Sequence, residues 1–353
     1  MRPRSDRVPV TNAAKATTLW GVVSVLCVVL VAMGAFGIAF GAVNIDLGTV
    51  ADVIWNRLLG GSQHIGGVND QIVWNLRTPR VLLAAAVGAG LALVGTVLQA
   101  TVRNPLADPY VLGVSAGAGL MASITITYGA AALAGLPTST TAFAGALMAT
   151  VAVLWLGQRG GRYSPTRLVL AGVTLSYLFT GLTSFVIFRS ADPDKTRSVM
   201  FWLLGSLGQA KWSNIAIPTT VVVVGCGYLL LQTRALNAMV LGDEAALSLG
   251  FPVHRLRWKF LISTSLMTGV LVALVGGIGF VGLVIPHLVR IIVGPDHRRV
   301  LPIAVLVGAI YLIAVDLLCR IVISPEELPI GIVTSVLGAP LFLWLLRRKG
   351  AER

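Results

Sequence analysis

The sequence has few charged residues, few acids and few cysteines, and each shortage excludes a class of protein. Only 12% of the 353 residues are charged while 56% are hydrophobic, which excludes both a disordered chain and an ordinary water-soluble domain. The three cysteines, Cys27, Cys226 and Cys319, are too far apart in sequence to form a C-x-x-C metal or redox site or a disulfide framework. The dipeptide Gly-Lys is absent, so the chain carries no Walker A nucleotide-binding motif.

The residues that are abundant indicate a polytopic, all-α membrane protein. The 39 glycines suit close helix packing, the eight tryptophans suit interfacial anchoring, and the mean hydropathy is +0.86. The formal charge of +13 could indicate a nucleic-acid partner, but the basic residues form short clusters between apolar runs and no continuous basic stripe. We therefore expect no nucleic-acid partner, and a single transmembrane domain over residues 1–353.

About ten apolar runs are long enough, or nearly long enough, to cross the hydrocarbon core of a bilayer. The first follows a basic tail, residues 1–17, and exceeds the length of a signal-peptide core, so we expect a retained span. An amphipathic stretch, Ile45–Asp70, with tryptophans around Trp55 and Trp74, predicts an interfacial helix. The expected spans are Leu19–Val43, Val81–Ala100, Val111–Ala132, Ala142–Leu156, Leu168–Phe188, Ile215–Leu231, Phe260–Val275, Phe280–Ile292, Leu301–Cys319 and Gly331–Leu346.

Two of these spans come from one stretch without formal charge, Phe260–Val289. A straight helix of that length would extend about 45 Å, too long for one crossing and too short for two. Gly276-Gly277-Ile278-Gly279 marks a break, so we expect two short or broken helices. A broken helix at membrane depth either lines a pathway or marks a glycine-mediated helix crossing.

The distribution of Lys and Arg orients the ten spans. With both termini cytoplasmic, 19 of the 27 basic residues fall in inside segments. Arg77, Arg80 and Arg320 are exceptions to this bias, because they fall at the external mouth. Their guanidinium groups suit bidentate binding of carboxylates, and snorkelling to lipid headgroups is the alternative.

Two inside segments have features of moving parts. Arg103–Pro109 holds two prolines and predicts a tight turn whose Asn104 and Leu106 reach the end of a pore. The loop 232–259 contains Gly242–Gly250, with two acids at the start and a glycine at the end, which predicts a short exposed helix. Such a helix fits docking of a soluble partner, and internal packing is the alternative.

These segments resemble the permease subunits of iron-siderophore, haem and cobalamin ABC importers, the FecCD-type or type II importer family. The resemblance covers roughly residues 20–346, and Thr78 and Pro165 depart from the family pattern. The motifs are R-T-P-R at Arg77, N-P-L-A-D-P at Asn104, L-G-V-S-A-G at Leu112, G-D-E-A-A-x-S-L-G at Gly242, G-x-I-G-F-V-G-L-V-I-P-H ending at His287, G-P-D-H-R-R at Gly294 and E-L-P-I-G-I-V-T at Glu327.

The resemblance implies a subunit of the bacterial cytoplasmic membrane that pairs with a second permease, identical or paralogous. It also implies two cytoplasmic ATPase subunits, an extracytoplasmic binding protein and, as cargo, a ferric siderophore, with haem or cobalamin as alternatives. No cofactor or metal is implied. By the same resemblance, Arg77, Arg80 and Arg320 dock the binding protein; Asn104, Leu106, Ser164, Pro165 and Thr166 form the cytoplasmic gate; and Gly242, Asp243, Glu244, Ala245, Ala246, Leu249 and Gly250 couple to the ATPase.

Two other function classes compete with this interpretation. A self-contained proton-coupled transporter needs intramembrane acids, of which Asp316 is the clear case, although its i,i+4 spacing to Arg320 favours an ion pair. An intramembrane enzyme needs a nucleophile and a base, and H-E-x-x-H is missing. His287 has no second ligand spaced with it, so we interpret it as structural.

Overall fold

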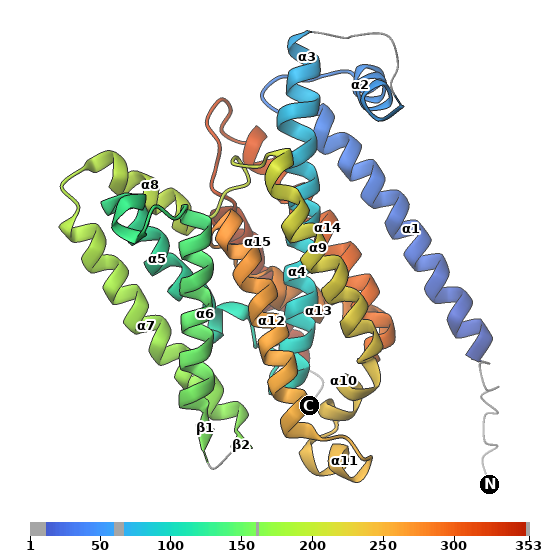
Figure 1. Ribbon diagram of the computed structural model, residues 1–353. Coiled ribbons are helices and arrows are strands. Elements are labelled where there is room, and N and C mark those ends of the chain that lie inside the picture. The colour runs from blue at the N-terminus through green and yellow to red at the C-terminus, as the bar shows by residue number, and fades with distance from the viewer. Residues whose placement is uncertain (1–11, 60–66, 160–161, 351–353) are drawn as a thin grey trace.

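The computed structural model describes residues 12–59, 67–159 and 162–350, and these residues form a helical bundle with one short hairpin (Figure 1). The expected all-α fold is confirmed. The elements are α1 (Asn12–Ala39), α2 (Leu47–Leu59), α3 (Val68–Asp70), the π-helix η1 (Gln71–Arg77), α4 (Thr78–Val102), the 3-10 helix η2 (Pro109–Leu112), α5 (Val114–Tyr128), the 3-10 helix η3 (Ala130–Leu133), α6 (Thr138–Gly157), β1 (Gln158–Arg159), β2 (Arg162–Tyr163), α7 (Pro165–Arg189), α8 (Pro193–Leu204), α9 (Trp212–Leu231), α10 (Thr233–Val240), α11 (Asp243–Ser248), α12 (Val253–Val275), α13 (Val281–Val293), α14 (His297–Ile321) and α15 (Ile330–Gly350).

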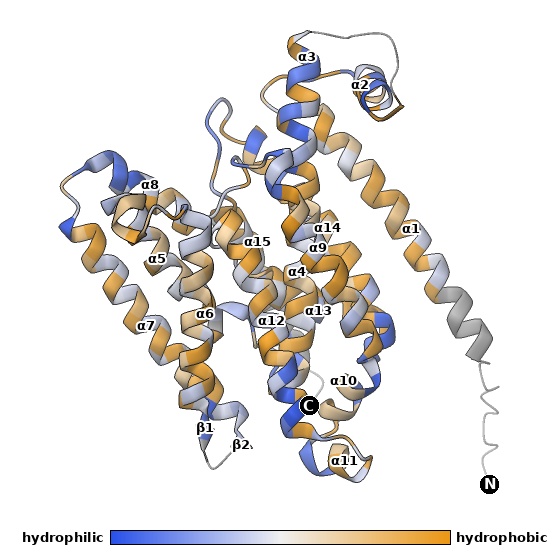
Figure 2. Cartoon of the chain, viewed as in Figure 1, coloured by the Kyte–Doolittle hydropathy of each residue, from blue (hydrophilic) through white to orange (hydrophobic). Residues whose placement is uncertain are grey.

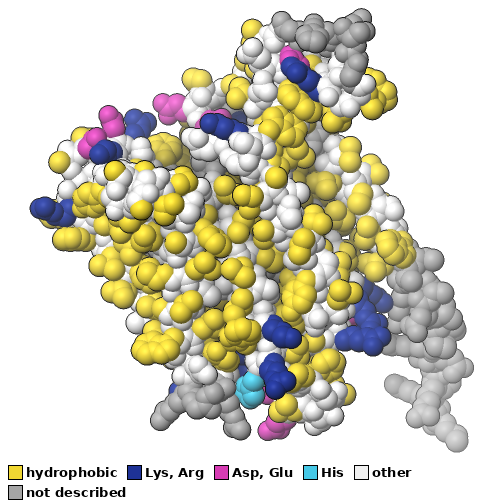
Figure 3. All heavy atoms as spheres, viewed as in Figure 1, with side chains coloured by type: hydrophobic (Ala, Val, Ile, Leu, Met, Phe, Trp, Pro, Cys, Tyr) yellow, Lys and Arg dark blue, Asp and Glu magenta, His cyan; other side chains and the backbone are white. Residues whose placement is uncertain are grey.

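The number of apolar helices agrees with the expected ten spans. Within the described residues, seven helices are long and apolar enough to cross a membrane, and three shorter apolar helices, α5, α13 and α15, complete the set. Hydrophobic residues cover the middle of the bundle (Figure 2), and charged side chains gather toward its two ends (Figure 3). This arrangement is what a bilayer requires of a protein surface.

Segments that the charge bias places on one side of the membrane lie together at one end of the bundle. We call this the α11 end, at the bottom of Figure 1, and the opposite one the α2 end. At the α11 end, Asn237 of α10 donates to Asp296 before α14 (2.7 Å), and Arg257 of α12 donates to Tyr163 of β2 (3.1 Å). These contacts agree with the expected alternation of the spans, and the orientation in the membrane stays a prediction.

The second span begins earlier than expected. The sequence places its start at Val81, after Pro79, but α3, η1 and α4 form one continuous helix, Val68–Val102. The helix continues through the proline because the backbone N–H and the hydroxyl of Thr78 both donate to the carbonyl of Val73, in a π turn. Trp74 therefore belongs to this helix, and the predicted amphipathic stretch forms α2, which contains Trp55.

Other boundaries also differ from expectation. The third span is α5, which is shorter than the predicted Val111–Ala132 because η2 and η3 take up its ends. Helices α8 and α10 were not predicted. Asp192 caps the start of α8, because its carboxylate accepts from the backbone N–H of Asp194 (2.9 Å), and Pro193 is the first residue of the helix. Helix α1 begins at Asn12 instead of Leu19, and residues 1–11 of the predicted tail lie outside the described residues.

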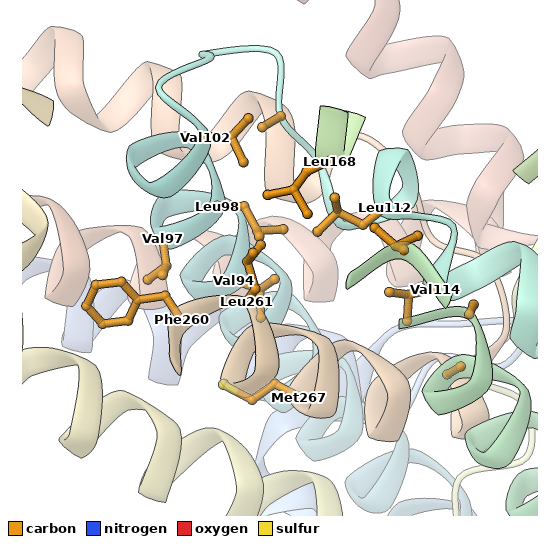
Figure 4. Close-up of a cluster of buried hydrophobic side chains, with 14 of the residues drawn as sticks. Val94, Val97, Leu98, Val102, Leu112, Val114, Leu168, Phe260, Leu261 and Met267 are labelled. Atoms are coloured by element: carbon orange, nitrogen blue, oxygen red, sulfur yellow. The ribbon is translucent and has the colours of Figure 1, made fainter. Parts of the chain in front are cut away.

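Helix α4 is the buried centre of the bundle and belongs to two hydrophobic clusters. Residues of its first half share one cluster with residues of α1, α13 and α14, and residues of its second half share the other with residues of α5, α6, α7 and α12. Figure 4 shows the second cluster, where Leu98 of α4, Leu168 of α7 and Leu261 of α12 converge. Both hydrophobic clusters therefore depend on α4.

Glycines let the neighbours of α4 approach its backbone. A Cβ atom at Gly88 would overlap the carbonyl of Gly308 in α14, and one at Gly95 would overlap the carbonyl of Gly282 in α13. Small residues at such crossings allow the close van der Waals contact that holds helices together in lipid. These contacts fix the middle of α4 against two other helices.

We predict that Gly88→Ala destabilises the protein by about 1–3 kcal/mol, because the added methyl group forces α4 away from α14. The measurement is the Tm of the purified protein in detergent. Gly227→Ala in α9 is the matched control, since nothing lies within 4 Å of the added carbon there and alanine favours a helix. Equal Tm values for the two variants would contradict the proposed close packing.

Candidate functional site

The α2 end contains a cleft of about 390 Å³ lined by the three exceptional arginines. Arg77 comes from η1, Arg80 from α4 and Arg320 from the last turn of α14. Glu327, in the segment that leads to α15, supplies a carboxylate to the same cleft. The structure thus brings together the three arginines that the sequence assigns to docking.

Arg77 and Arg320 are both buried and bind the carbonyl groups at the end of α1. The last carbonyls of a helix lack intrahelical donors, and a cation near them is also favoured by the helix dipole. The acceptors are Ile38 and Ala39 (2.8 Å each) and Val43 for Arg77, and Gly37 (2.8 Å) and Phe40 (3.2 Å) for Arg320. These two guanidinium groups therefore hold α1 against the rest of the bundle.

Arg80 connects α4, α14 and the segment before α15. Its Nε donates to Asp316 (2.8 Å), and its Nη1 donates to both carboxylate oxygens of Glu327 (2.8 and 2.9 Å). Asp316 also lies 3.1 Å from Nε of Arg320, which confirms the expected i,i+4 ion pair. Glu327 forms its ion pair with Arg80.

The break between α12 and α13 lines a second cavity, of about 430 Å³. Gly277 and Gly279 contribute to its wall. Gly276 and Gly277 also lie against the backbone carbonyls of Trp202 and Leu203, so the break both faces a cavity and allows a close helix crossing. The backbone N–H of Ile278 bonds with the Tyr110 hydroxyl, which satisfies a donor that the break exposes. The lining residues are Tyr110, Ser115, Ala116, Ser176, Leu203, Leu204, Gly277, Gly279, Gly331 and Ser335, none of them charged.

Ser115 in this cavity belongs to Gly113-Val114-Ser115-Ala116-Gly117, which matches the letters G-x-S-x-G. In hydrolases that motif places the serine on a turn between a strand and a helix. Here it lies at the junction of η2 and α5, and Gly113 has a φ of 74°. Neither a histidine nor a carboxylate is among the residues that line the cavity around Ser115.

The turn after α4 is built as the two prolines predict. Arg103 ends the helix with a φ of 53°, and the side-chain oxygen of Asn104 accepts from the backbone N–H of Leu106 (2.9 Å). The Leu106 side chain is exposed at the α11 end. The gate function of Asn104 and Leu106 stays a prediction.

The other expected gate residues lie between β2 and α7. Ser164 immediately precedes α7, Pro165 takes its first position, where a missing N–H costs nothing, and Thr166 is exposed. The departure of Pro165 from the family pattern is thus compatible with the start of a helix. Arg257, which the sequence did not distinguish from its basic neighbours, contacts Thr101 and Tyr163, and these residues adjoin the two predicted gate segments.

The predicted coupling segment forms the short helix α11. Gly242 and Gly250 flank it with φ values of 114° and 83°, conformations that favour glycine. Ala246 packs inward, whereas Glu244 and Leu249 are exposed. Burial tends to raise the pKa of Asp243, but the hydrogen bond and charge of Arg257 lower it overall, so this acid stays ionised at neutral pH.

Among the described residues, no group of three or more His, Cys, Asp or Glu side chains could hold a metal ion. His287 is buried in α13. The candidate site therefore consists of the two cavities, the two predicted gate segments and α11.

The family model of the FecCD transport family matches residues 27–348. The chain belongs to this family. It is thus a membrane-embedded transport permease, as the sequence motifs indicate.

Relatives and solved structures agree with this assignment. The chain is 38% identical to the hemin transport system permease protein HmuU of Yersinia pestis, over 93% of this chain and 96% of the relative. It is 41% identical to the cobalamin import system permease protein BtuC of Halobacterium salinarum, over 78% and 73% of the two chains. A solved metal-chelate type ABC transporter in an inward-facing conformation is 31% identical and covers 94% of this chain and 99% of its own, with a TM-score of 0.80.

We predict that Arg77→Met destabilises the protein by about 1–3 kcal/mol, because buried carbonyls at the end of α1 lose their donor. Arg57→Met is the matched control, since Arg57 of α2 is 48% exposed and a surface ion pair with Asp70 contributes about 0–1 kcal/mol. Thermal unfolding followed by tryptophan fluorescence measures both. If Arg77→Met leaves the Tm at the Arg57→Met value, these bonds do not hold α1.

Proposed function

We propose that this chain is the permease subunit of an ATP-binding-cassette importer that moves a large metal chelate by alternating access. The single observation that carries the proposal is the uncharged 430 Å³ cavity beside the break between α12 and α13. A wall of glycine, small hydroxyl and apolar side chains can pass a bulky ligand without holding it through a charge. The cavity lies between the arginine cleft at the α2 end and the turn with Asn104 and Leu106 at the α11 end, a position that fits a pathway.

The proposal includes partners at both ends of the bundle. A second permease, identical or paralogous, completes the pathway; two ATPase subunits bind at α11; and an extracytoplasmic binding protein docks at the arginine cleft. This arrangement puts the α11 end and both termini in the cytoplasm of a bacterium. The absence of a Walker A motif from the sequence supports hydrolysis of ATP by a separate subunit.

Our proposed cargo is a ferric siderophore, the assignment that the sequence resemblance favours. The names of HmuU and BtuC favour hemin or cobalamin as the second candidate. All three are metal chelates, and the lining of the cavity is compatible with each. A transport assay with one probe of each kind decides between them.

We predict ATP-dependent uptake by proteoliposomes that contain the complete transporter and enclosed ATP. The probes are ferrichrome, hemin and cyanocobalamin, each presented with the binding protein, and one of them accumulates. A protonophore leaves the rate unchanged, because Asp316 is held in ion pairs with Arg80 and Arg320 and is not a proton carrier. Uptake driven by a pH gradient without the ATPase would replace this proposal with a proton-coupled transporter.

The docking proposal can be sharpened, because Glu327 already occupies Arg80. An acidic residue of the binding protein would compete with Glu327 for this guanidinium group. We therefore predict that Glu327→Gln strengthens docking, whereas Arg80→Glu weakens it at least about ten-fold, through loss of a charged contact. The measurement is binding-protein affinity for the transporter in nanodiscs.

Glu326→Gln is the matched control for Glu327→Gln. Glu326 is exposed and adjacent, and the two substitutions change the net charge equally. Equal effects would show that only the overall charge of this surface matters. No effect of Arg80→Glu would remove the cleft as the docking site.

A further inference from the structure

Arg257 is a fully buried cation at the α11 end. It lies in the second turn of α12 and has no exposed surface, although Arg255 and Lys259 on the same helix are exposed. A buried guanidinium group is tolerated only when its donors are paired. The contacts of Arg257 therefore show what holds this end together.

The guanidinium group contacts three separate segments. Its Nε donates to the carbonyl of Thr101 (3.3 Å), and its Nη1 donates to the carbonyl of Tyr163 (3.1 Å). Its Nη2 and Nη1 donate to the two carboxylate oxygens of Asp243, at 2.8 and 3.3 Å. One planar group thus fixes the relative positions of α4, β2 and α11.

Each contacted residue adjoins a segment with a proposed moving part. Thr101 is in the last turn of α4, directly before the turn with Asn104 and Leu106, and Tyr163 immediately precedes Ser164. Asp243 is the first residue of α11. Along the chain, the three contacts are 156, 94 and 14 residues from Arg257, so only the tertiary fold brings them together.

We propose that Arg257 is the positioning residue that transmits a displacement of α11 to both gate segments. The inference rests on the proposed importer function and adds the connection between its ATPase-binding and gating parts. When α11 moves, Asp243 either carries the guanidinium group along or leaves a buried charge unpaired. The first course costs less, and the same group then displaces the ends of α4 and β2.

Arg103 is a second cation beside Asp243. Its Nη2 lies 3.5 Å from Oδ1 of Asp243, the oxygen that accepts from Nη2 of Arg257, and its side chain is 39% exposed. The carboxylate thus lies between a buried cation and a solvent-facing cation. Because Arg103 ends α4, this second contact also connects Asp243 directly with the turn that contains Asn104 and Leu106.

The test compares Arg257→Lys with Arg255→Lys in the reconstituted transporter, with uptake and ATP hydrolysis measured in the same vesicles. Lysine keeps the charge but loses the planar fork that reaches three acceptors. We expect Arg257→Lys to insert and hydrolyse ATP normally while uptake per ATP falls at least about ten-fold. Arg255→Lys should match the wild type. A parallel loss of insertion, ATP hydrolysis and uptake would assign Arg257 a merely structural role and overturn the inference.

A second readout does not depend on uptake. Spin labels at Gln158 and Ser248, both exposed, report the distance between the hairpin and α11 in a background without the native cysteines. In the wild type the two labels move together when an ATP analogue is added, so their separation is constant. In Arg257→Gln, as in Asp243→Asn, α11 should move alone and the distance should change.

The outcomes separate this inference from the proposed function. If the wild type shows no ATP-dependent uptake of any probe, the importer assignment itself fails. If the wild type transports and Arg257→Lys keeps its uptake per ATP, with an unchanged label distance in Arg257→Gln, the importer assignment stands and the role of Arg257 is wrong.

Discussion

Backbone groups at helix ends need partners inside this protein, because a bilayer offers no water to bind them. Arg77 and Arg320 donate to carbonyls at the end of α1, and Arg257 donates to a carbonyl in the last turn of α4. The break after α12 is closed by the backbone N–H of Ser206, which donates to the carbonyl of Val275 (2.8 Å). The placement of buried polar groups in the bundle follows from this requirement.

The arginines therefore combine two roles that are usually separate. Arg77 and Arg320 stabilise the end of α1 and also form the wall of the cleft at the α2 end. Arg80 binds buried Asp316 through its Nε and half-exposed Glu327 through its Nη1. A partner at this cleft would meet a cationic surface whose geometry is already fixed by the fold, so little side-chain entropy is lost on binding.

The features that local sequence determines were predicted well. Apolar length gave the number of spans, the glycine run gave the break before Phe280, and the paired acids after Gly242 gave α11. The start of the second span was missed because Pro79 is typical of a helix start, and the two donors of Thr78 that carry the helix past it have no sequence signature.

Long-range contacts could not be read from the chain. Arg257 lies in the same short basic run as Arg255, and its acceptors Thr101 and Tyr163 are 156 and 94 residues away, so the sequence did not identify it. Likewise, the acceptors of Arg77 are backbone carbonyls. Every residue has a carbonyl group, so no residue type near position 40 predicts this contact. The sequence could identify Arg77, Arg80 and Arg320 as exceptions to the charge bias but could not show that two of them bind the carbonyls at the end of α1.

The continuous helix from Val68 to Val102 has a further mechanical consequence. At 1.5 Å per residue this helix is about 50 Å long; Arg77 and Arg80 lie about a third of the way along it, and Thr101 lies at its far end. Between these positions, Gly88 and Gly95 lie against α14 and α13. If the helix tilts about these two contacts, the arginine cleft and Thr101 move in opposite directions, so a partner at the cleft and Arg257 would act on the same rigid element.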